Sequence, residues 1–390
     1  MKLVIFTHPD FFDSTSMPKY ADMLLAGMKS RGHQADAATA KPFFIKMAFS
    51  VSSRKWLGYL DQFLVFPYQM KKQLRKLPDD TLFVFSDHAL GPWVPLVKNR
   101  PHVVHCHDFL AQRSAMGEIR QNPVSFTGKI YQTYIRNGYR SAKNFISISQ
   151  KTKSDLHLFL KKNPNLSEVV YNGFNQEFQL DEPVGSREQL SIEWKLNLKS
   201  GYILHVGGNQ FYKNRRAVIQ IYSKWRENTE LELPLIMVGA EPTKALTREK
   251  QASAFSQDVH FITGVSDLWL RKFYTGASVL LFPSLEEGFG WPIAEAMASG
   301  CPVITTNKPP MNEVGGEYCF YLAPYPENEK NIFSWSERAG ELLERVVQMP
   351  EKERKEFIVA AKHYSKRFDS STAIENIETI YKEVLNNNNV

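Results

Sequence analysis

The chain lacks the features that mark several protein classes. No apolar run approaches the roughly 18 residues that a membrane-crossing helix needs. The start, MKLVIFTHPDFF, is broken at His8 and Pro9, so we expect a buried strand there and no signal peptide. Only three cysteines occur in 390 residues, and they are far apart in the sequence: Cys106, Cys301 and Cys319. With no C-x-x-C pair, this usage disfavours zinc and redox sites and fits a reducing cytoplasm.

Several sequence motifs are absent as well. No G-x-G-x-x-G follows the first apolar run, which disfavours a dehydrogenase. There is no D-x-D motif of the kind that many metal-dependent transferases use, and no repeat of fixed period. What remains is an ordinary globular composition, 43% hydrophobic and 23% charged, in a chain too long for one core. Two domains are therefore expected.

Positive charge is concentrated in the first half of the chain. Residues 1–180 hold 24 Lys and Arg against 13 Asp and Glu, or +11, whereas the remainder holds 24 against 28, or −4. In residues 41–77, eight Lys or Arg and one Asp are interleaved with aromatic residues. This pattern fits docking on anionic lipid headgroups. It equally fits amphipathic helices with a solvated basic face. Nucleic-acid binding is a weaker third interpretation, because no recognised binding motif accompanies the charge.

Short apolar runs alternate with helical patterns in both halves of the sequence. The runs that we predict to be strands are LVIF, TLFVFSD (81–87), HVVHCHD (102–108), NFISIS (144–149), YILHVGG (202–208), LPLIMVG (233–239), VHFITG (259–264), SVLLFP (278–283) and PVITT (302–306). This rhythm predicts an α/β protein with two Rossmann-like, doubly wound parallel sheets. The predicted domains are residues 1–180 and 181–369, with a terminal helix at about 370–386 packing back on the first domain.

The segment SLEEGFGWPIAEAMASG (284–300) predicts an anion site. It leaves the carboxyl end of a buried strand, Pro292 suits the first turn of a helix, and Gly300 ends that helix. A helix amino terminus at that edge of a parallel sheet presents free N–H groups and partial positive charge. Because Gly288 and Gly290 carry no side chains, a phosphate or diphosphate can approach the backbone.

Two glutamates flank this predicted phosphate site. Glu287 and Glu295 are eight positions apart, which at a helical rise of about 1.5 Å per residue is on the order of 10 Å. A nucleotide-sugar diphosphate is of similar length, and each carboxylate could accept hydrogen bonds from a pair of neighbouring hydroxyls. The alternative is an acidic first turn that only complements the helix dipole.

These residues resemble a known family, the retaining family 4 glycosyltransferases of the GT-B architecture. The resemblance rests on PSLEEGFGWPIAEAMASGCPVI with the spacing Glu287-x(7)-Glu295 and on HVGGNQFYKN (205–214). The resemblance extends to three further segments: HFITGVSDLWLRKFYTGASVLLFPS, which precedes the PSLEEGFG motif, NEVGGEYCFYLAP (312–324), which follows it, and VVYNGFN (169–175). It implies an acceptor-binding domain and a donor-binding domain that face each other across a cleft.

The resemblance also implies roles for individual residues. Glu287 would contact the transferred sugar, and Lys213 would bind the phosphate, although Lys213 could also be an exposed lysine at a helix start. Glu295 would hold the ribose. The other implied donor contacts are Gly208, Asn209, Val265, Gly288, Phe289 and Gly290. Where the family commonly has an arginine, five residues before the lysine, this chain has Gly208, and Arg215 or Arg216 are the candidate substitutes.

In the first domain, His107 matches the family's histidine near the donor sugar. The neighbouring His102 and His105 raise the alternative of a metal site, which we disfavour because no pair of carboxylates completes it. His205 is expected to be a core residue. The family's glycine pair after the first strand is absent here, where the sequence is HPDFFDSTSMPKYA.

The sequence therefore predicts a glycosyltransferase. It would move a sugar from a nucleoside-diphosphate sugar to a glycan or lipid-linked acceptor, with retention and without a metal or other cofactor. The expected location is the cytoplasm, with residues 41–77 as a contact to the inner face of the plasma membrane, and no nucleic-acid partner. The alternatives are a GT-B nucleotide-sugar epimerase and a non-catalytic sugar-nucleotide-binding protein.

Overall fold

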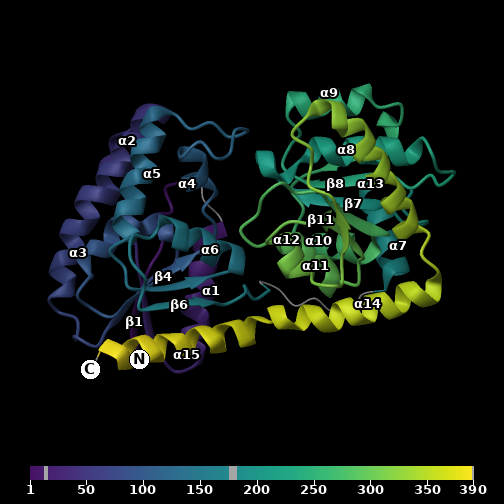
Figure 1. Ribbon diagram of the computed structural model, residues 1–390. Coiled ribbons are helices and arrows are strands. Elements are labelled where there is room, and N and C mark those ends of the chain that lie inside the picture. Colours follow the sequence, from purple (N-terminus) through teal and green to yellow (C-terminus); the bar gives the residue numbers. More distant parts are fainter. Residues whose placement is uncertain (13–15, 175–181, 389–390) are drawn as a thin grey trace. The chain divides into compact units, whose positions relative to one another are not determined.

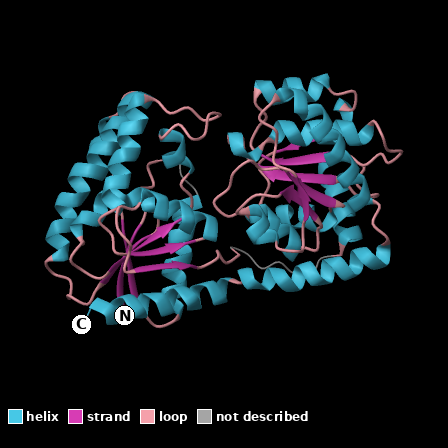
Figure 2. Cartoon of the chain, viewed as in Figure 1, coloured by secondary structure: helices cyan, strands magenta, loops and turns pink. Residues whose placement is uncertain are grey.

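The computed structural model describes residues 1–12, 16–174 and 182–388 (Figure 1). The chain divides into two compact units: Met1–Asn175 together with Ser370–Val390, and Gln176–Asp369. The domain boundary predicted between residues 180 and 181 lies outside the described residues. In each unit, helices flank the strands of one sheet (Figure 2).

The first unit is built on a parallel sheet of six strands in the order β2-β1-β3-β4-β5-β6. The strands are β1 (Lys2–Phe6), β2 (Gln34–Ala38), β3 (Leu82–Phe85), β4 (His102–Cys106), β5 (Asn144–Ser147) and β6 (Leu166–Val169). The helices and helical turns are α1 (Ser16–Ser30), η1 (Phe44–Met47), α2 (Val51–Leu60), η2 (Asp61–Val65), α3 (Phe66–Leu74), η3 (His88–Leu96), α4 (Leu110–Ala115), α5 (Phe126–Tyr139), α6 (Gln150–Phe159) and α15 (Ser370–Asn388).

The second unit repeats this plan with the strand order β12-β11-β10-β7-β8-β9. Its strands are β7 (Ile203–Gly207), β8 (Leu235–Gly239), β9 (Val259–Ile262), β10 (Val279–Phe282), β11 (Val303–Thr306) and β12 (Phe320–Leu322). Its helices and turns are α7 (Pro183–Trp194), η4 (Phe211–Lys213), α8 (Arg215–Arg226), α9 (Lys244–Ala252), η5 (Ser256–Asp258), α10 (Asp267–Gly276), α11 (Trp291–Ala298), α12 (Met311–Gly315), η6 (Glu329–Asn331), α13 (Ile332–Val347), α14 (Glu351–Ser365) and η7 (Lys366–Phe368).

Strands β3 and β10, in the interior of their sheets, are apolar throughout because helices cover both faces of each sheet. All four residues of β3, LFVF, are buried, as are all four of β10, VLLF. Every described strand pair is parallel. Parallel sheets covered on both faces select such continuous Val, Leu, Ile and Phe runs. The predicted α/β fold with two doubly wound parallel sheets is confirmed.

Helix α15 returns the chain to the first unit after the second is complete. Its apolar residues Ile374, Ile377 and Tyr381 are buried in one cluster with Leu3 of β1 and Leu24 of α1. Within the described residues, no helix combines the length and apolarity needed to cross a membrane.

Both sheets reverse their strand order beside their first strand. In the first unit the chain runs from β1 outward to β2 and then returns to β3 on the other side of β1. In the second unit β8 and β9 lie on one side of β7, and β10 to β12 lie on the other. Ligands of doubly wound folds bind outside the carboxyl ends of the strands at such reversals. The expected ligand-binding positions are therefore the loops after β1 and β3 in the first unit, and after β7 and β10 in the second.

Candidate functional site

The reversal point of the second unit brings Lys213 and Glu287 together. Lys213 ends η4 after β7, and Glu287 lies in the loop after β10. The Lys213 Nζ donates to Glu287 Oε1 at 2.8 Å, and both side chains are largely buried, at 14% and 8% exposure. Ser284 Oγ donates to the same oxygen at 2.7 Å. Lys213 is thus no exposed lysine, and the arrangement places one cation and one carboxylate where a charged ligand with hydroxyls can meet both.

Hydrogen bonds join the two loops that carry this pair. The amide N–H of Leu285 donates to the carbonyl of Tyr212 at 2.8 Å. Asn214, with a left-handed φ of 50°, donates its side-chain amide to the carbonyl of Pro283 at 3.1 Å. Because each loop is anchored to the other, the position of Lys213 depends on the conformation of the loop after β10.

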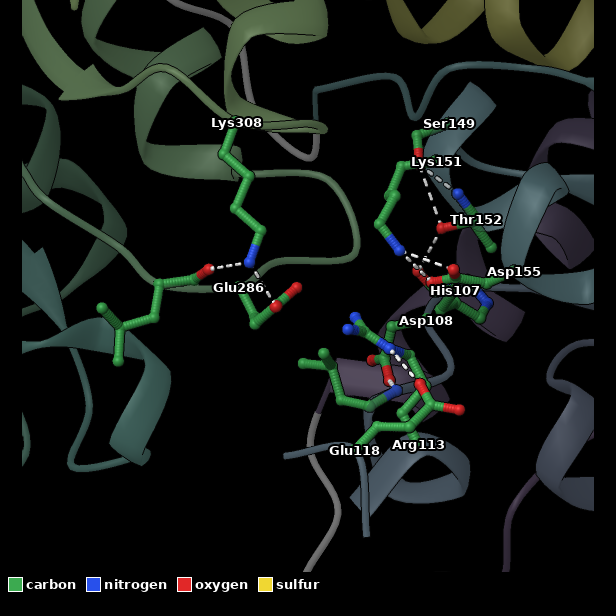
Figure 3. A network of polar contacts seen from close by, with 12 residues as sticks. His107, Asp108, Arg113, Glu118, Ser149, Lys151, Thr152, Asp155, Glu286 and Lys308 are labelled. Carbon is green, nitrogen blue, oxygen red and sulfur yellow. Dashed lines mark hydrogen bonds and ion pairs between the residues drawn. The ribbon is translucent and has the colours of Figure 1, made fainter. Parts of the chain in front are cut away.

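Lys308 fixes the same loop from its other side. It follows β11 and donates to the carbonyl of Leu285 at 3.1 Å, and its ammonium forms an ion pair with the buried carboxylate of Glu286. Figure 3 shows the Lys308 side chain directed at Glu286. The first of the two adjacent glutamates is therefore held by a structural ion pair, which leaves the second to face Lys213.

The glycine-rich part of the loop is shaped by the start of α11. Gly290 precedes the helix with a φ of 101°, a left-handed value that favours glycine. Between the two glycines, the Phe289 ring is buried against Trp291 and Phe368, with ring centroids 5.3 Å apart in each case. Phe289 is therefore an anchor that turns the backbone of the loop, while any contact with a ligand falls to main-chain groups.

Glu295 lies one turn inside α11. Tyr274 donates its hydroxyl to Glu295 Oε2 at 2.8 Å. Burial raises the pKa of Glu295 to about 7, and Asp267 adds to the rise, while Tyr274 and Lys213 oppose it. Only the part from Trp291 onward is helical, so the helical rise used to estimate the separation of the two glutamates applies to half of that segment. The loop conformation sets the remainder.

The glycine pair after β7 lies where two strands approach closely. A Cβ on Gly239 would lie 2.0 Å from the carbonyl oxygen of Gly207, so the end of β8 tolerates no side chain there. Asn209 is held on both sides: its amide nitrogen donates to the carbonyl of Glu241 at 2.6 Å, and its oxygen accepts from Arg215 at 2.6 Å. Gly208, between these anchored residues, is the part of the loop without a side chain.

The two candidate substitutes for the missing arginine have different surroundings. Arg215 is buried beside the loop, where it also donates to the carbonyl of Ala240 at 2.9 Å. Arg216 is exposed and pairs with Glu249 at 2.9 Å. Only Arg215 therefore supports the loop. Val265 lies partly buried between β9 and α10, at the same carboxyl edge of the sheet.

In the first unit, His107 follows β4 and is buried. Its Nε2 lies 2.8 Å from the carbonyl oxygen of Ser86, which identifies Nε2 as the protonated nitrogen. Burial lowers the pKa of His107, although Asp87 opposes that shift. Thr152 donates to the carbonyl of His107, and beside it Lys151 pairs with Asp155 at 2.5 Å (Figure 3). His107 is thus a buried and firmly oriented imidazole.

The other histidines considered in the sequence, His102, His105 and His205, have structural partners. His105 bonds to the hydroxyls of Tyr20 and Tyr381 at 2.9 and 2.8 Å, and burial lowers its pKa to about 3. His102 bonds to the carbonyl of Arg100 at 2.7 Å. His205 is fully buried and bonds to the carbonyl of Leu281, as expected of a core residue. Among the described residues, no three His, Cys, Asp or Glu side chains are placed to hold a metal ion.

Comparison with known families covers most of the chain. The family described as "Glycosyl transferases group 1" matches residues 186–364, and that described as "Glycosyltransferase Family 4" matches residues 17–178. The chain belongs to the family 4, group 1 glycosyltransferases.

Curated relatives match this chain over part of their own length. The O-antigen chain mannosyltransferase RfbU of Salmonella typhimurium is 26% identical over 263 residues, covering 66% of this chain and 64% of that protein. The O-antigen chain mannosyltransferase B of Escherichia coli is 32% identical over 35% of this chain and 36% of its own. An MMP alpha-(1->4)-mannosyltransferase of Mycolicibacterium hassiacum is 37% identical over 45% of this chain and 40% of its own. The chain thus spans less than two thirds of the length of these relatives.

Solved structures share the fold of this family 4 chain across nearly its whole length. Anabaena Alr3699/HepE, solved in complex with UDP and glucose, has a TM-score of 0.70 at 16% identity, covering 98% of this chain and 100% of its own. WaaG, a glycosyltransferase involved in lipopolysaccharide biosynthesis, has a TM-score of 0.67 at 15% identity, covering 97% and 99%. At such low identity the likeness establishes the GT-B fold alone.

Several residues that build the two sites were not predicted from the sequence. Ser284, Lys308 and Tyr274 hold the two glutamate-bearing segments, and His8 and Asp87 pair in the first unit. For four of them a signal was present: His8, Ser284 and Lys308 follow a predicted strand by one or two residues, and Asp87 ends one. Tyr274 comes from the interior of a helix and gave none.

Proposed function

We propose that the protein transfers a sugar from a nucleoside-diphosphate sugar to a glycan or lipid-linked acceptor. The observation that carries this proposal is the Lys213–Glu287 pair at the reversal point of the second unit, beside the amino terminus of α11. An ammonium and a helix amino terminus stabilise a diphosphate, while carboxylates bind sugar hydroxyls. Membership of the glycosyltransferase family supports the same conclusion.

Each part of the donor would have its own contacts. Lys213 and the backbone of Gly288, Phe289 and Gly290 would hold the diphosphate and sugar. Glu287 would bind hydroxyls of the transferred sugar, and Glu295 the ribose diol. The remaining contacts proposed from the family resemblance are Gly208, Asn209, Val265 and, for the transferred sugar, His107.

The proposed reaction retains the configuration at the anomeric carbon. The leaving phosphate would take the proton of the acceptor hydroxyl on the same face, so the protein's part is to position charge. Because Lys213 and the α11 terminus can neutralise the diphosphate, turnover should not depend on a divalent ion. Activity that is abolished by EDTA and restored by Mg²⁺ or Mn²⁺ would contradict this.

The names of the relatives support mannose as the transferred sugar. The three curated relatives compared above are mannosyltransferases by name, two of them of the O-antigen chain. We therefore propose a mannosyl donor and a mannose-containing glycan as acceptor.

Thermal stabilisation by a panel of donors tests the donor class. UDP-, GDP-, ADP- and TDP-sugars, with GDP-mannose among them, should separate by the shift in melting temperature, since a ligand at 100 times its Kd adds about 2.7 kcal/mol of stability. Stabilisation by none of them would refute the donor site. Release of an epimer from donor alone would favour the epimerase alternative, and binding without transfer or epimerisation the non-catalytic one.

The segment 41–77 supports a further part of the proposal, contact with an anionic membrane. Asp61, its one acid, is buried and accepts from the amides of Phe43, Phe44 and Ile45, so the acid is structural. Large apolar side chains remain exposed, with Phe49 at 92%. The others in this segment are Phe43, Met47, Val51, Trp56, Leu60, Leu64 and Tyr68.

Exposed basic residues lie in the same segment. Lys71, Lys72, Arg75 and Lys76 are all exposed at the end of α3. Exposed aromatic and aliphatic side chains next to cations match a headgroup layer, in which each Lys or Arg contributes about 1 kcal/mol. We propose that the first unit rests on the inner face of the plasma membrane, which suits a lipid-linked acceptor.

Flotation with anionic vesicles separates the membrane proposal from a solvated helical face. Changing these four basic residues to Glu should release the protein, as should Phe49→Ser combined with Val51→Ser. Leu158→Ser, at an apolar residue of α6 that is also exposed, is the matched control and should float like the wild type. If the wild type stays at the bottom at low salt, the segment binds no anionic membrane.

A further inference from the structure

A histidine and a carboxylate meet at the reversal point of the first unit. His8 follows β1, and Asp87 follows β3, the strand across the reversal. The Nε2 of His8 lies 2.8 Å from Asp87 Oδ2. Seventy-nine positions separate the two residues, so only the pairing of β1 with β3 brings them together.

The surroundings of Asp87 favour the ionised form of its carboxyl group. Burial alone would raise its pKa, but the neighbouring His88 and His8 hold the pKa of Asp87 well below its usual range. Its Oδ1 accepts the amide N–H of Ala89 at 3.1 Å and caps η3. The cap uses Oδ1 of Asp87. It does not explain the contact of Oδ2 with His8.

The pairing with Asp87 fixes which atom of His8 is available. An ionised carboxylate accepts a hydrogen bond, so Nε2 of His8 carries a proton, and in the neutral tautomer with that proton the lone pair lies on Nδ1. Within residues 1–12, 16–174 and 182–388, no hydrogen bond involves Nδ1 of His8, and the side chain is 17% exposed. An oriented imidazole therefore presents an acceptor atom at the surface of the unit.

Two hydroxyls next to the pair also lack hydrogen-bond partners among the described residues. Thr7 Oγ1, beside His8, and Ser86 Oγ, beside Asp87, are buried atoms without one. Buried polar groups cost free energy unless they are paired, so native structures keep few of them without a reason. Their position at one reversal point makes this edge unusually polar for the end of two apolar strands.

We propose that the His8–Asp87 pair binds a hydroxyl of the acceptor glycan, with His8 Nδ1 accepting the hydrogen bond. The proposal rests on the glycosyltransferase function and assigns the reversal point of the first unit to the acceptor, as that of the second is assigned to the donor. Asp87 is the positioning residue, since it touches His8 and fixes the ring.

Two substitutions separate the two ring nitrogens. In His8→Gln, the amide nitrogen takes roughly the place of Nε2, so the contact with Asp87 can persist while the acceptor atom at Nδ1 is lost. In His8→Asn, a polar atom remains near Nδ1 but the contact with Asp87 is lost. His33→Gln is the matched control, because His33 makes the same type of contact, 2.8 Å to Glu378, just before β2, at the amino ends of the strands.

Kinetics with GDP-mannose and octyl α-mannoside give the first readout. We expect His8→Gln to raise the KM for octyl α-mannoside about tenfold, the effect of losing one hydrogen bond, with the donor-induced melting shift unchanged. His33→Gln should match the wild type in both. An unchanged acceptor KM in His8→Gln, or an equal rise in His33→Gln, would overturn the proposal. A wild type that no donor stabilises would count against the donor site and the proposed function.

Direct observation of the histidine gives a second readout that needs no turnover. In protein labelled at histidine, the His8 signal is identified by its loss in His8→Gln. Titration with octyl α-mannoside should shift this signal and leave that of His33 in place. A His8 signal that does not move across the titration would refute the assignment.

Discussion

Replacing Glu295 by Gln should stabilise the protein at alkaline pH and weaken its donor site. The pKa of Glu295 is raised from 4.5 to about 7, chiefly by burial. Below pH 4.5 the carboxyl is protonated in both folded and unfolded chains, and folding is not penalised. As pH rises from 4.5 to 7, the unfolded chain ionises first, so stability falls, and above 7 the whole cost is present.

The magnitude follows from the size of the shift. At about 1.4 kcal/mol per pKa unit, the change corresponds to about 3 kcal/mol of lost stability above pH 7. Glutamine is neutral at every pH, and its amide oxygen can still accept from Tyr274. Glu295→Gln should therefore regain up to about 3 kcal/mol at pH 8.5, which for a unit of this size is roughly 6 to 12 °C in melting temperature.

Thermal melts of both proteins at pH 4.5 and 8.5 test this prediction. The two melting temperatures should agree at pH 4.5 and diverge at pH 8.5, with the variant higher. A donor that stabilises the wild type should stabilise the variant less, because an ionised carboxylate binds the ribose diol more strongly than an amide does. A difference that is the same at both pH values would show that charge burial is not its cause.

Other substitutions probe the rest of the donor site. Glu287→Gln should lower turnover at least tenfold while the protein stays folded, because the sugar loses a charged hydrogen bond worth about 1.5–3 kcal/mol. The turnover number is measured at saturating donor. A wild-type turnover number in the variant would show that Glu287 is not part of the site. Lys308→Met should raise the donor Kd by freeing the loop, whereas Lys330→Met, at an exposed lysine, should not; equal Kd values in titration calorimetry would refute the loop's role. Gly290→Ala should cost about 1–2 kcal/mol in urea unfolding because its φ is 101°, and an unchanged unfolding midpoint would show that the turn tolerates a side chain.

The sequence predicted the inner strands of both sheets and only one of their four edge strands, β9. Nine apolar runs were expected, and each contains a strand of the structure. The unpredicted strands are β2, β6 and β12, with sequences QADAA, LSEV and FYL. Each of them lies at an edge of its sheet, so only one neighbouring strand supports it and its sequence needs no continuous apolar run. These three edge strands are specified by their partners more than by their own residues.

Sequence reasoning about the site succeeded where the chemistry is local and failed where it depends on contacts between distant loops. The glycine loop and the start of α11 could be inferred because they lie within a dozen consecutive residues. That Glu287 binds Lys213, 74 positions away, is a consequence of β10 pairing with β7. The same limit hid the His8–Asp87 pair, whose two residues are 79 positions apart.

Helix α15 has a consequence for the order in which the chain folds during synthesis. The ribosome completes the described strands of the first unit early, yet Ile374, Ile377 and Tyr381 of its core, and the Tyr381 hydroxyl that meets His105, are made only after the second unit. A domain usually folds once its sequence has emerged, amino-terminal domain first. Here the second unit, which is continuous in sequence, can finish first, while the first keeps an apolar face uncovered until α15 has been synthesised. A nascent chain stalled before residue 370 should therefore need a chaperone on its amino-terminal half.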